Sequence, residues 1–564
     1  MLLGKGNGVT DDACSFLVVL DTPSVKQFVF GTDALPEVRG ASAILDGLNR
    51  QRTEQVLQAQ LAAGGAQVEK IYANGGSGQF LVRHCRLAPL RAALDVLART
   101  YREATGGEVR LAAGVAECQS AADYRQAVRL AHFQLRSRRE MAGVCRAASL
   151  QPLMKECESA SHLPAARAVS WGGEGRLFLS EASRGKREAS HTARREGVWS
   201  EWMRAAGFPE PDWAALRCDR FEQVGAAPGR RGRAGEIGLV YADGNAMGRL
   251  VQELDSPETC RAFSETVDTS LREACFEALA QCLSPEIQRA RQALSSGAKI
   301  VPLPADILLL GGDDLLVVLP ADRALPFARA VCQEFERRTR EAIAGLAGPV
   351  RQFFADRVAG RGLTISCGVA LGRANYPFYL LLDLVEQLLH SAKRAGSGQQ
   401  SGPYAAGALI DFHRVAGAAS HELKHVRRED YQAETDRPRT LRPLSLAQLS
   451  ALQEAVRTLR RSRFPRSKLH ALFEAALAES PVQAERRVRE VFSRCRDSDR
   501  QPERRALWEA VARLAPSGWH CEFPWFEPPP GSEEEQTRDR QDRRLTPIAD
   551  LAEAYDLFPL QEEG

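Results

Sequence analysis

Short apolar runs alternate along the chain with segments of helical periodicity, and the same succession occurs twice. In the first unit, a helical pattern lies between the first two of four predicted strands, at residues 16–20, 67–73, 79–83 and 113–116, and further helices are predicted at 87–104 and 121–139. In the second unit, the pattern predicts strands at residues 237–242, 307–310, 315–319 and 367–370, and helices at 260–282, 325–343 and 378–395. Because the same order of strands and helices is predicted in both units, each unit supports the assignment of the other.

Each unit has a glycine-rich turn between its two middle strands and the sequence Gly-Val-Ala in its last strand. The order β-α-β-β-α-β describes a ferredoxin-like antiparallel sheet with helices on one face. We therefore predict an α+β protein with two ferredoxin-like palm domains, a small inter-palm domain and a C-terminal helical domain.

The remaining segments differ from the palms in composition. We predict a first palm at 1–145, an inter-palm domain at 146–234, a second palm at 235–415, a helical domain at 416–526, and a disordered linker with a helical tail at 527–564. Glycine- and arginine-rich stretches at 172–186 and 225–235 are expected to be surface loops. The run 528–544 is rich in Pro, Glu and Arg and is expected to be disordered, whereas an apolar pattern resumes at 547–558.

Composition and charge exclude some classes of protein. The 564 residues include 75 Lys and Arg against 72 Asp and Glu, which leaves a formal charge of +3. A strongly basic nucleic-acid coat is therefore excluded, although a local basic face is not. The sequence has no signal-peptide pattern and no apolar stretch of membrane-spanning length, and its 13 cysteines lack paired spacing. We expect a cytoplasmic protein with reduced thiols and no membrane contact.

The second unit carries acidic residues at the ends of buried strands. Asp243 follows an apolar strand, and Asp313 with Asp314 lies at the tip of the hairpin predicted beside that strand. The first and third strands of this topology are neighbours, so the three carboxylates can converge at one rim of the sheet. Clustered carboxylates suit Mg²⁺ or Mn²⁺, and such ions can activate an attacking hydroxyl and stabilise a leaving pyrophosphate. We predict that these three residues are catalytic and hold the metal.

A Gly-Gly-Asp-Asp hairpin is by itself a good β-turn and often has no other role. Two adjacent aspartates between apolar strands, however, require compensation of their charge, and a metal ion is the natural source. The glycines allow a nucleotide to approach closely, and glycines before a helix can present backbone N–H groups to phosphates. The predicted nucleotide contacts in this unit are Gly244, Asn245, Gly248, Gly311 and Gly312.

In the first unit the corresponding turn is Gly75-Gly76-Ser77-Gly78, without carboxylates. The turn keeps small residues, and Lys26 follows the first strand. Two interpretations remain open. Gly75, Gly76, Ser77 and Lys26 can form a site for a second nucleotide, or this palm serves only as a packing partner.

The chain resembles the large, polymerase-like subunit of type III CRISPR–Cas effector complexes over roughly Phe16–Val415. The segments that carry the resemblance are Asp21–Phe28, Arg39–Ser42, Asn74–Gly78, Asp243–Gly248, Gly311–Asp314 and Ile410–His413. The resemblance implies that the second palm joins ATP into cyclic oligoadenylates when the complex captures target RNA. It also implies a triphosphate contact for Lys393 and, as partners, repeat-family CRISPR subunits with guide and target RNA.

Two features depart from this family. Many members begin with an HD-type nuclease domain, whereas this sequence contains no His-Asp dipeptide, so we expect no nuclease activity. Members also often carry a zinc ribbon with two Cys-x-x-Cys pairs, of which only Cys157 remains here. Structural zinc requires four ligands, so no zinc is expected and Cys157 is predicted to be a small buried residue.

Three other functions were weighed. The chain can be a scaffold subunit, with the basic region Arg427–Arg466 binding RNA or neighbouring subunits. It can also be a stand-alone defence polymerase that makes another cyclic nucleotide. A diguanylate cyclase is disfavoured, because Leu315 replaces the usual Phe after the acidic pair and no Arg-x-x-Asp motif precedes the glycines. Ring size, base preference, activating signal and oligomeric state are not encoded in any motif.

Overall fold

The first palm is a four-stranded antiparallel sheet with strand order β2-β3-β1-β4. In the computed structural model, its strands are β1 (Cys14–Asp21), β2 (Gln67–Asn74), β3 (Ser77–Cys85) and β4 (Ala112–Glu117). Its helices are α1 (Val25–Phe30), α2 (Leu35–Gly47), α3 (Thr53–Leu61), α4 (Leu87–Ala104) and α5 (Tyr124–Met141), with a π-helical turn at Leu48–Arg52 between α2 and α3. The structure describes residues 14–23, 25–141, 154–170, 175–226, 235–358, 360–398, 407–415, 422–430, 440–478, 486–487, 489–491, 501–516, 518, 520–522, 525–527 and 546–559.

The second palm repeats this strand order and extends it by two strands. Its sheet has the order β12-β11-β10-β7-β9-β8, so β7 and β9 are neighbours as β1 and β3 are. The strands are β7 (Glu236–Gly244), β8 (Asp306–Gly311), β9 (Asp314–Pro320), β10 (Ile365–Arg373), β11 (Leu409–Arg414) and β12 (Leu444–Ser445). The helices are α9 (Met247–Glu253), α10 (Pro257–Cys282), α11 (Ser284–Ser296), α12 (Ala321–Gly345), α13 (Gly348–Val358) and α14 (Phe378–Gly398). The predicted α+β class with two ferredoxin-like palms is confirmed.

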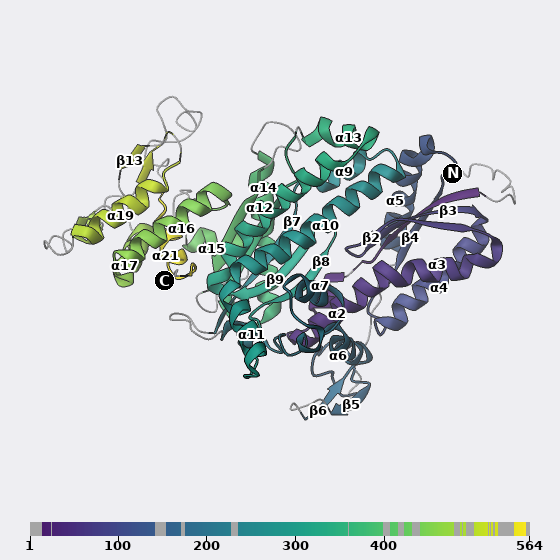
Figure 1. The fold of residues 1–564 in the computed structure, drawn as a ribbon, viewed down its shortest axis with the longest axis horizontal. Coiled ribbons are helices and arrows are strands. Elements are labelled where there is room, and N and C mark those ends of the chain that lie inside the picture. The colour runs from purple at the N-terminus through teal and green to yellow at the C-terminus, as the bar shows by residue number, and fades with distance from the viewer. Residues whose placement is uncertain are drawn as a thin grey trace.

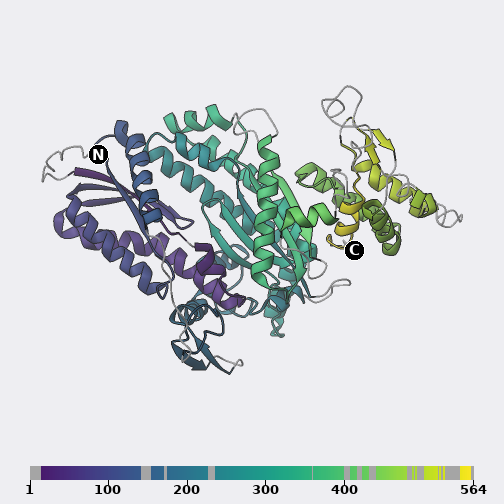
Figure 2. The ribbon, with the colours of Figure 1, turned by 180° about the vertical axis from the view of Figure 1, so that it is seen from behind.

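Alternating side chains of the palm strands enter two different cores. Phe16, Val18 and Leu20 lie in one buried cluster, and Leu17 and Val19 lie in another. Both clusters contain residues of both palms. Because both faces of β1 are covered, the strand reads as a continuous apolar run in the sequence. The two palms thus share their apolar interior, and they lie side by side in both ribbon views (Figures 1 and 2).

The inter-palm region consists of a small hairpin and short helices below the palms in Figure 1. Its elements are β5 (Arg167–Ser170), β6 (Arg176–Leu179), α6 (Glu181–Ala193), α7 (Gly197–Ala205) and α8 (Phe221–Gly225). The sequence prediction of a surface loop at 172–186 is wrong for its described part. Residues from Arg176 onward form β6 and the start of α6, because the Ser180 hydroxyl caps the helix by accepting from the Ser183 amide.

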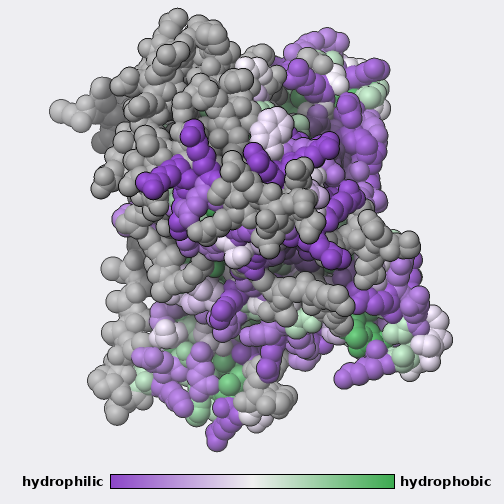
Figure 3. Space-filling model, turned by 90° about the vertical axis from the view of Figure 1, so that its left-hand side faces the viewer, coloured by the Kyte–Doolittle hydropathy of each residue, from purple (hydrophilic) through white to green (hydrophobic). Residues whose placement is uncertain are grey.

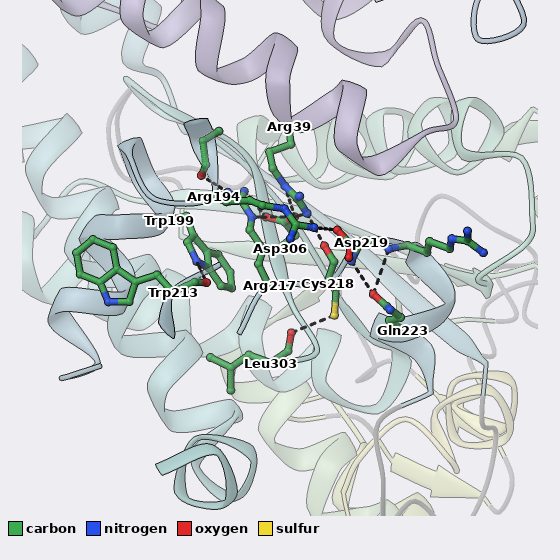
Figure 4. Close-up of polar contacts among 12 residues, drawn as sticks. Arg39, Arg194, Trp199, Trp213, Arg217, Cys218, Asp219, Gln223, Leu303 and Asp306 are labelled. Atoms are coloured by element: carbon green, nitrogen blue, oxygen red, sulfur yellow. Dashed lines mark hydrogen bonds and ion pairs between the residues drawn. The ribbon is translucent and has the colours of Figure 1, made fainter. Parts of the chain in front are cut away.

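A buried charge cluster joins the inter-palm region to both palms (Figure 4). Asp306, the first residue of β8, accepts hydrogen bonds from Arg39 on α2 (2.7 Å) and from Arg217 (2.6 Å). Gly40, beside Arg39, allows α2 and α6 to touch, because an added Cβ would lie 1.6 Å from the Lys186 carbonyl oxygen. The Arg39–Ser42 segment therefore has a structural role that the sequence did not indicate.

The C-terminal helical region lies at the left of Figure 1, and many of its buried residues belong to the same apolar cluster as residues of the second palm. Its described elements are α15 (Leu423–Asp430), α16 (Leu446–Arg461), α17 (Arg466–Ala478), α19 (Gln501–Arg513), β13 (His520–Glu522), β14 (Trp525–Glu527) and α21 (Ile548–Ala554). Hydrophilic side chains prevail among the described residues on this side, with apolar side chains in separate spots (Figure 3). The predicted disordered run 528–544 lies outside the described residues.

The predicted helical tail packs on the body of the protein. Asp550 on α21 accepts hydrogen bonds from the Thr440 hydroxyl (2.6 Å) and from the Leu441 amide (2.8 Å). Arg442 pairs with Asp550 (2.9 Å) and donates to the Phe412 carbonyl of β11 (2.7 Å), so the tail is tied to the edge of the second palm sheet. Among the described residues, no helix is long and apolar enough to cross a membrane.

Candidate active site

The three predicted carboxylates lie at one rim of the second palm sheet. Ala242 of β7 pairs with Leu315 of β9, so one step further along both strands places Asp243 opposite Asp314. Opposed residues of an antiparallel pair have neighbouring side chains on the same face. Asp313 is the preceding residue, in the turn that joins β8 to β9. The topology therefore brings together what the sequence placed 70 residues apart.

Crowding of negative charge disfavours ionisation of the turn carboxylates. Burial raises the pKa of Asp313 above its usual range, and the nearby Asp243 and Asp314 raise it further. Burial, together with Asp243, also raises the pKa of Asp314, whereas Lys26, Tyr241 and Lys393 act in the opposite direction. Without further positive charge this arrangement is electrostatically unfavourable, which is a common property of catalytic sites.

Lys393 and Tyr241 hold two of these carboxylates. Lys393 on α14 forms an ion pair with Asp243, and the Tyr241 hydroxyl donates to Asp314 Oδ1 (3.2 Å). The family resemblance implied a triphosphate contact for Lys393, and Tyr241 was not among the predicted site residues. The sequence does indicate Tyr241, since it precedes Asp243 by two residues in the same strand and therefore points to the same face of the sheet.

Lys26 belongs to the first palm, but its side chain contacts the second. Its ammonium group lies 2.9 Å from Glu386 Oε1 on α14 and 5.0 Å from the centre of the Tyr241 ring. It also lowers the pKa of Asp314. Lys26 therefore lies beside the second-palm site, and its role as a nucleotide contact stays a prediction.

The loop after β7 is shaped by close contacts. Asn245 is fixed to Thr364, with its amide N–H bonded to the carbonyl (2.8 Å) and its side chain bonded to the hydroxyl (2.9 Å). Gly244 has no room for a side chain, because an added Cβ would lie 2.3 Å from Met247 Cγ and 2.8 Å from Asp313 Oδ2. Gly248 was expected before the helix, but it is the second residue of α9. Its role as a phosphate contact therefore stays a prediction.

Replacing Gly244 with alanine is expected to displace Asp313 and to destabilise the fold by about 1–3 kcal/mol through overpacking. Gly248→Ala is the matched control, since an added Cβ there meets nothing within 4 Å. Thermal unfolding of both variants checks the packing, and ATP binding checks the site. Unchanged stability in Gly244→Ala would contradict the close contact, whereas weakened ATP binding in Gly248→Ala would place a nucleotide against α9.

The first-palm turn that corresponds to Gly311–Asp314 is Asn74–Ser77, one residue earlier than the predicted Gly75–Gly78. Asn74 pairs with Ser77 as Gly311 pairs with Asp314, so the register equates Gly75 with Gly312 and Gly76 with Asp313. Gly75 and Gly312 share positive φ angles of 57° and 63°. Ser77 thus occupies the position of Asp314, opposite Asp21 on β1.

Contacts within the protein surround the glycines of the first-palm turn. An added Cβ at Gly76 would lie 2.8 Å from Val25 Cγ2, and one at Gly75 would lie 3.3 Å from the Gly311 carbonyl oxygen. These contacts require small residues for packing, whether or not a nucleotide binds. They favour the interpretation of this palm as a packing partner, while nucleotide binding there stays a prediction.

The internal repeat extends to one charged pair. Asp21 ends β1 and pairs with Arg139 on α5 (2.8 Å), just as Asp243 near the end of β7 pairs with Lys393 on α14. The two helices follow the last ferredoxin-like strand of their palms. The first palm therefore keeps one carboxylate and its cation, but it lacks the two carboxylates of the turn.

The donor set of the second palm fits a divalent cation. Three carboxylates meet at one rim, where burial and the neighbouring carboxylates raise the pKa values of Asp313 and Asp314, and clustered carboxylates are the ligands that Mg²⁺ or Mn²⁺ takes. Among the described residues, no group of three or more His, Cys, Asp or Glu side chains forms a ready-made metal cage. Since Asp243 is paired with Lys393, release of this ion pair would free it to act as a ligand.

The remnant of the predicted ribbon is held by hydrogen bonds. Cys157 is buried, as predicted, and its Sγ accepts from the Ser180 amide (3.2 Å) and lies 3.5 Å from the Ser183 hydroxyl. Although burial raises the pKa of this thiol, its hydrogen bonds with Ser183 and Ser180 lower the pKa below its usual range. The cysteine is therefore polar in its contacts and does not act only as a small apolar residue.

Comparison with protein families identifies the second palm. Residues 236–400 match the model described as Cas10/Cmr2, second palm domain. No curated protein sequence matches the chain. The matched range contains all three carboxylates and Lys393.

Solved structures of Csm1–Csm4 cassettes are similar to the chain. The structure in complex with pppApA aligns with 14% identity and a TM-score of 0.48 over 89% of this chain and 69% of that chain. The complex with one ATP aligns with 14% identity and a TM-score of 0.45 over 89% and 70%. The complex with cA3 aligns with 14% identity and a TM-score of 0.43 over 68% of this chain, which spans about half (53%) of that one.

Proposed function

We propose that this chain is a Mg²⁺-dependent nucleotidyltransferase that makes cyclic oligoadenylates from ATP, since residues 236–400 match the model described as Cas10/Cmr2, second palm domain. We also propose that it works with repeat-family subunits and guide and target RNA in a type III CRISPR effector. The observation that carries the proposal is the meeting of Asp243, Asp313 and Asp314 at one rim, beside Lys393.

The proposed reaction needs a nucleophile, a base and charge stabilisation. The 3′-oxygen of one nucleotide forms a bond to the α-phosphorus of the next, and the bond between that phosphorus and the α–β bridging oxygen breaks to release pyrophosphate. Asp243, Asp313 and Asp314 would hold Mg²⁺, which would supply charge stabilisation for this transfer. Asp313 or Asp314 would accept the proton of the 3′-hydroxyl.

Lys393 has two alternative partners in this scheme. Without a nucleotide it is paired with Asp243. A triphosphate offers more negative charge than one carboxylate, so Lys393 moves to the phosphates and Asp243 is released. The basic side chain thus holds Asp243 in place until substrate arrives.

The proposal is tested by incubating the purified chain with Mg²⁺ and each nucleoside triphosphate, with and without RNA, and identifying the products by mass. Cyclic adenylates are the expected product. If the chain alone forms no product, the same assay is repeated with the neighbouring subunits and target RNA. The absence of adenylate products from the assembled, RNA-bound complex would refute the proposal. A cyclic product that contains another base would show that another nucleoside triphosphate, and not ATP, is the substrate.

Lys393→Ala is expected to raise the KM for ATP about tenfold, because a charged phosphate contact is lost. Lys299→Ala, which removes an exposed lysine far from Asp243 along the chain, is the control. Initial rates across an ATP series measure the effect. If the KM of Lys393→Ala equals that of the native chain, Lys393 does not contact the triphosphate.

A scaffold role is a second candidate, resting on the basic region Arg427–Arg466. In the structure, Arg427 pairs with Asp411, Arg460 donates to the Phe558 carbonyl (2.5 Å), and Arg466 pairs with Asp556 (3.0 Å). Part of this positive charge is therefore used inside the fold. Salt-sensitive binding of RNA by the full chain would support the scaffold role.

A further inference from the structure

Helix α10 carries a polar stripe that faces the first palm and both glycine-rich turns. Ser264 and Asp268 lie one helical turn apart, at i and i+4, and therefore on one face. Ser264 accepts a hydrogen bond from the Asn74 side chain at the first-palm turn (3.0 Å). Asp268 Oδ1 accepts one from the Gly312 amide at the second-palm turn (3.1 Å). A single helix thus touches the tips of both hairpins.

Asp268 is fixed by an arginine of the first palm. Arg50 donates to both carboxylate oxygens, with distances of 2.8 Å to Oδ1 and 3.0 Å to Oδ2. Its Nε also donates to Asp46 (2.6 Å), which orients the guanidinium group. A planar guanidinium bound through two parallel hydrogen bonds restricts the carboxylate more than a single contact does.

Arg50 lies in an irregular part of its helix. Residues Leu48–Arg52 form a π-helical turn between α2 and α3. Such turns are rare and occur frequently at functional sites, because the extra residue per turn redirects side chains. The position of this irregularity at Arg50 is an observation independent of the ion pair itself.

We propose that Arg50 and Asp268 are a positioning pair through which the first palm holds the Gly311–Asp314 turn in its active geometry. The pair touches neither substrate nor metal in this scheme. It acts through the Gly312 amide, which precedes the two turn carboxylates. This proposal deepens the proposed function and rests on it.

The turn needs such support for two physical reasons. Gly312 has a positive φ of 63°, and glycine loses more conformational freedom on ordering than any other residue. In addition, Asp313 and Asp314 lie close to each other and to Asp243, so their repulsion favours opening of the hairpin tip. A hydrogen bond from the Gly312 amide to a charged, immobilised carboxylate opposes both effects. The first palm, which lacks turn carboxylates of its own, thereby contributes to the site of the second.

The test combines a catalytic and a non-catalytic measurement on the purified full chain. Arg50→Met removes the bidentate contact, Asp268→Ala removes both contacts, and Asp268→Asn keeps an acceptor for the Gly312 amide while losing the charge. Hydrogen exchange of the peptide that carries Gly311–Asp314 reports the order of the turn without ATP or metal. We expect about tenfold faster exchange in Arg50→Met and Asp268→Ala and a smaller rise in Asp268→Asn.

In the catalytic assay, kcat is expected to fall about tenfold in Arg50→Met with little change in KM, since misplaced carboxylates impair the chemical step. The double variant Arg50→Met with Asp268→Ala should lose no more than Asp268→Ala alone, because the two residues act as one unit. If the chain makes no product at all, the exchange measurement still tests the positioning pair independently of the proposed function.

Arg261→Met is the matched control. Arg261 lies on the same stripe of α10 and pairs with Glu69 of the first palm, so it joins the same two domains without touching the second-palm turn. We expect turn exchange and kcat to stay at native values in this variant. The proposal is overturned if the exchange of the turn is unchanged in both Arg50→Met and Asp268→Ala, or if Arg261→Met accelerates it equally. A rise in KM with unchanged kcat in Arg50→Met would also overturn it.

Discussion

Replacing Asp313 and Asp314 together with alanine is expected to abolish nucleotide polymerisation, with a loss on the order of a thousandfold or more. The variant lacks two of the three proposed metal ligands and both candidate bases, while Asp243 alone remains at the rim. Mass analysis of the products with Mg²⁺ and ATP measures the loss. Asp95→Ala, which removes an exposed carboxylate of α4, is the control and should keep native activity.

The same double variant should fold at least as stably as the native chain. Burial and neighbouring carboxylates raise the pKa values of both residues, so their ionised forms are unfavourable in the folded state. Removing them relieves this repulsion, and we expect an unchanged or higher melting temperature in metal-free buffer. Product synthesis at the native rate would refute the site assignment, and a large loss of stability would refute the electrostatic account.

The second large effect concerns stability and lies in the cluster of Figure 4. Asp306 is fully buried between Arg39 and Arg217, whose side chains are 1% and 4% exposed. The two arginines keep the pKa of Asp306 below its usual range against the effect of burial, whereas burial and Arg39 lower the pKa of Arg217 to about 9. Asp306→Asn leaves two guanidinium groups facing each other without a counter-charge.

We expect Asp306→Asn to lower the free energy of unfolding by about 3–5 kcal/mol, as removal of one partner of a buried ion pair does. Asp219→Asn is the matched control, because Asp219 pairs with Arg194 near the same cluster but its side chain is 51% exposed. A surface pair of this kind contributes at most about 1 kcal/mol. Chemical denaturation of both variants measures the difference, and equal losses would contradict the role of burial.

Asp306 lies on the same strand as the start of the catalytic turn, so the buried charge cluster and the candidate active site are joined by β8. It begins β8, and β8 ends at Gly311 in the turn that carries Asp313 and Asp314. Arg39 of the first palm therefore anchors the start of this strand, while Arg50, through Asp268, contacts its end. We expect the two anchors to be separable in experiment, with Arg39 acting mainly on stability and Arg50 mainly on the turn.

Most of the fold was predictable because buried strands and amphipathic helices leave periodic patterns in the chain. The predicted strand at 237–242 lies within β7, and the predicted helix at 87–104 coincides with α4. Helix α11 was missed, because its few apolar positions lie among polar residues. The parallel strand β11 was also missed, since its apolar segment follows the last predicted helix without a repeat partner.

The candidate site was predictable in part for a topological reason. Once the order of strands was recognised, the neighbourhood of β7 and β9 followed, and with it the meeting of Asp243 with Asp313 and Asp314. The family resemblance drew attention to Lys393 but assigned it to a phosphate, whereas the folded chain pairs it with Asp243. A charged side chain in a sequence gives no sign of which distant partner it will meet.

The sequence by itself determined the two palm units, the positions of their turns and the presence of carboxylates in only one of them, because these depend on local patterns and on strand order. Only the tertiary structure decided that Lys26 belongs to the second-palm site, that the first-palm turn is shifted by one residue in register, and that Arg50 and Asp268 meet. These features depend on contacts that no local pattern records, including contacts between segments 360 residues apart (Lys26 with Glu386), which burial of shared apolar surface brings together.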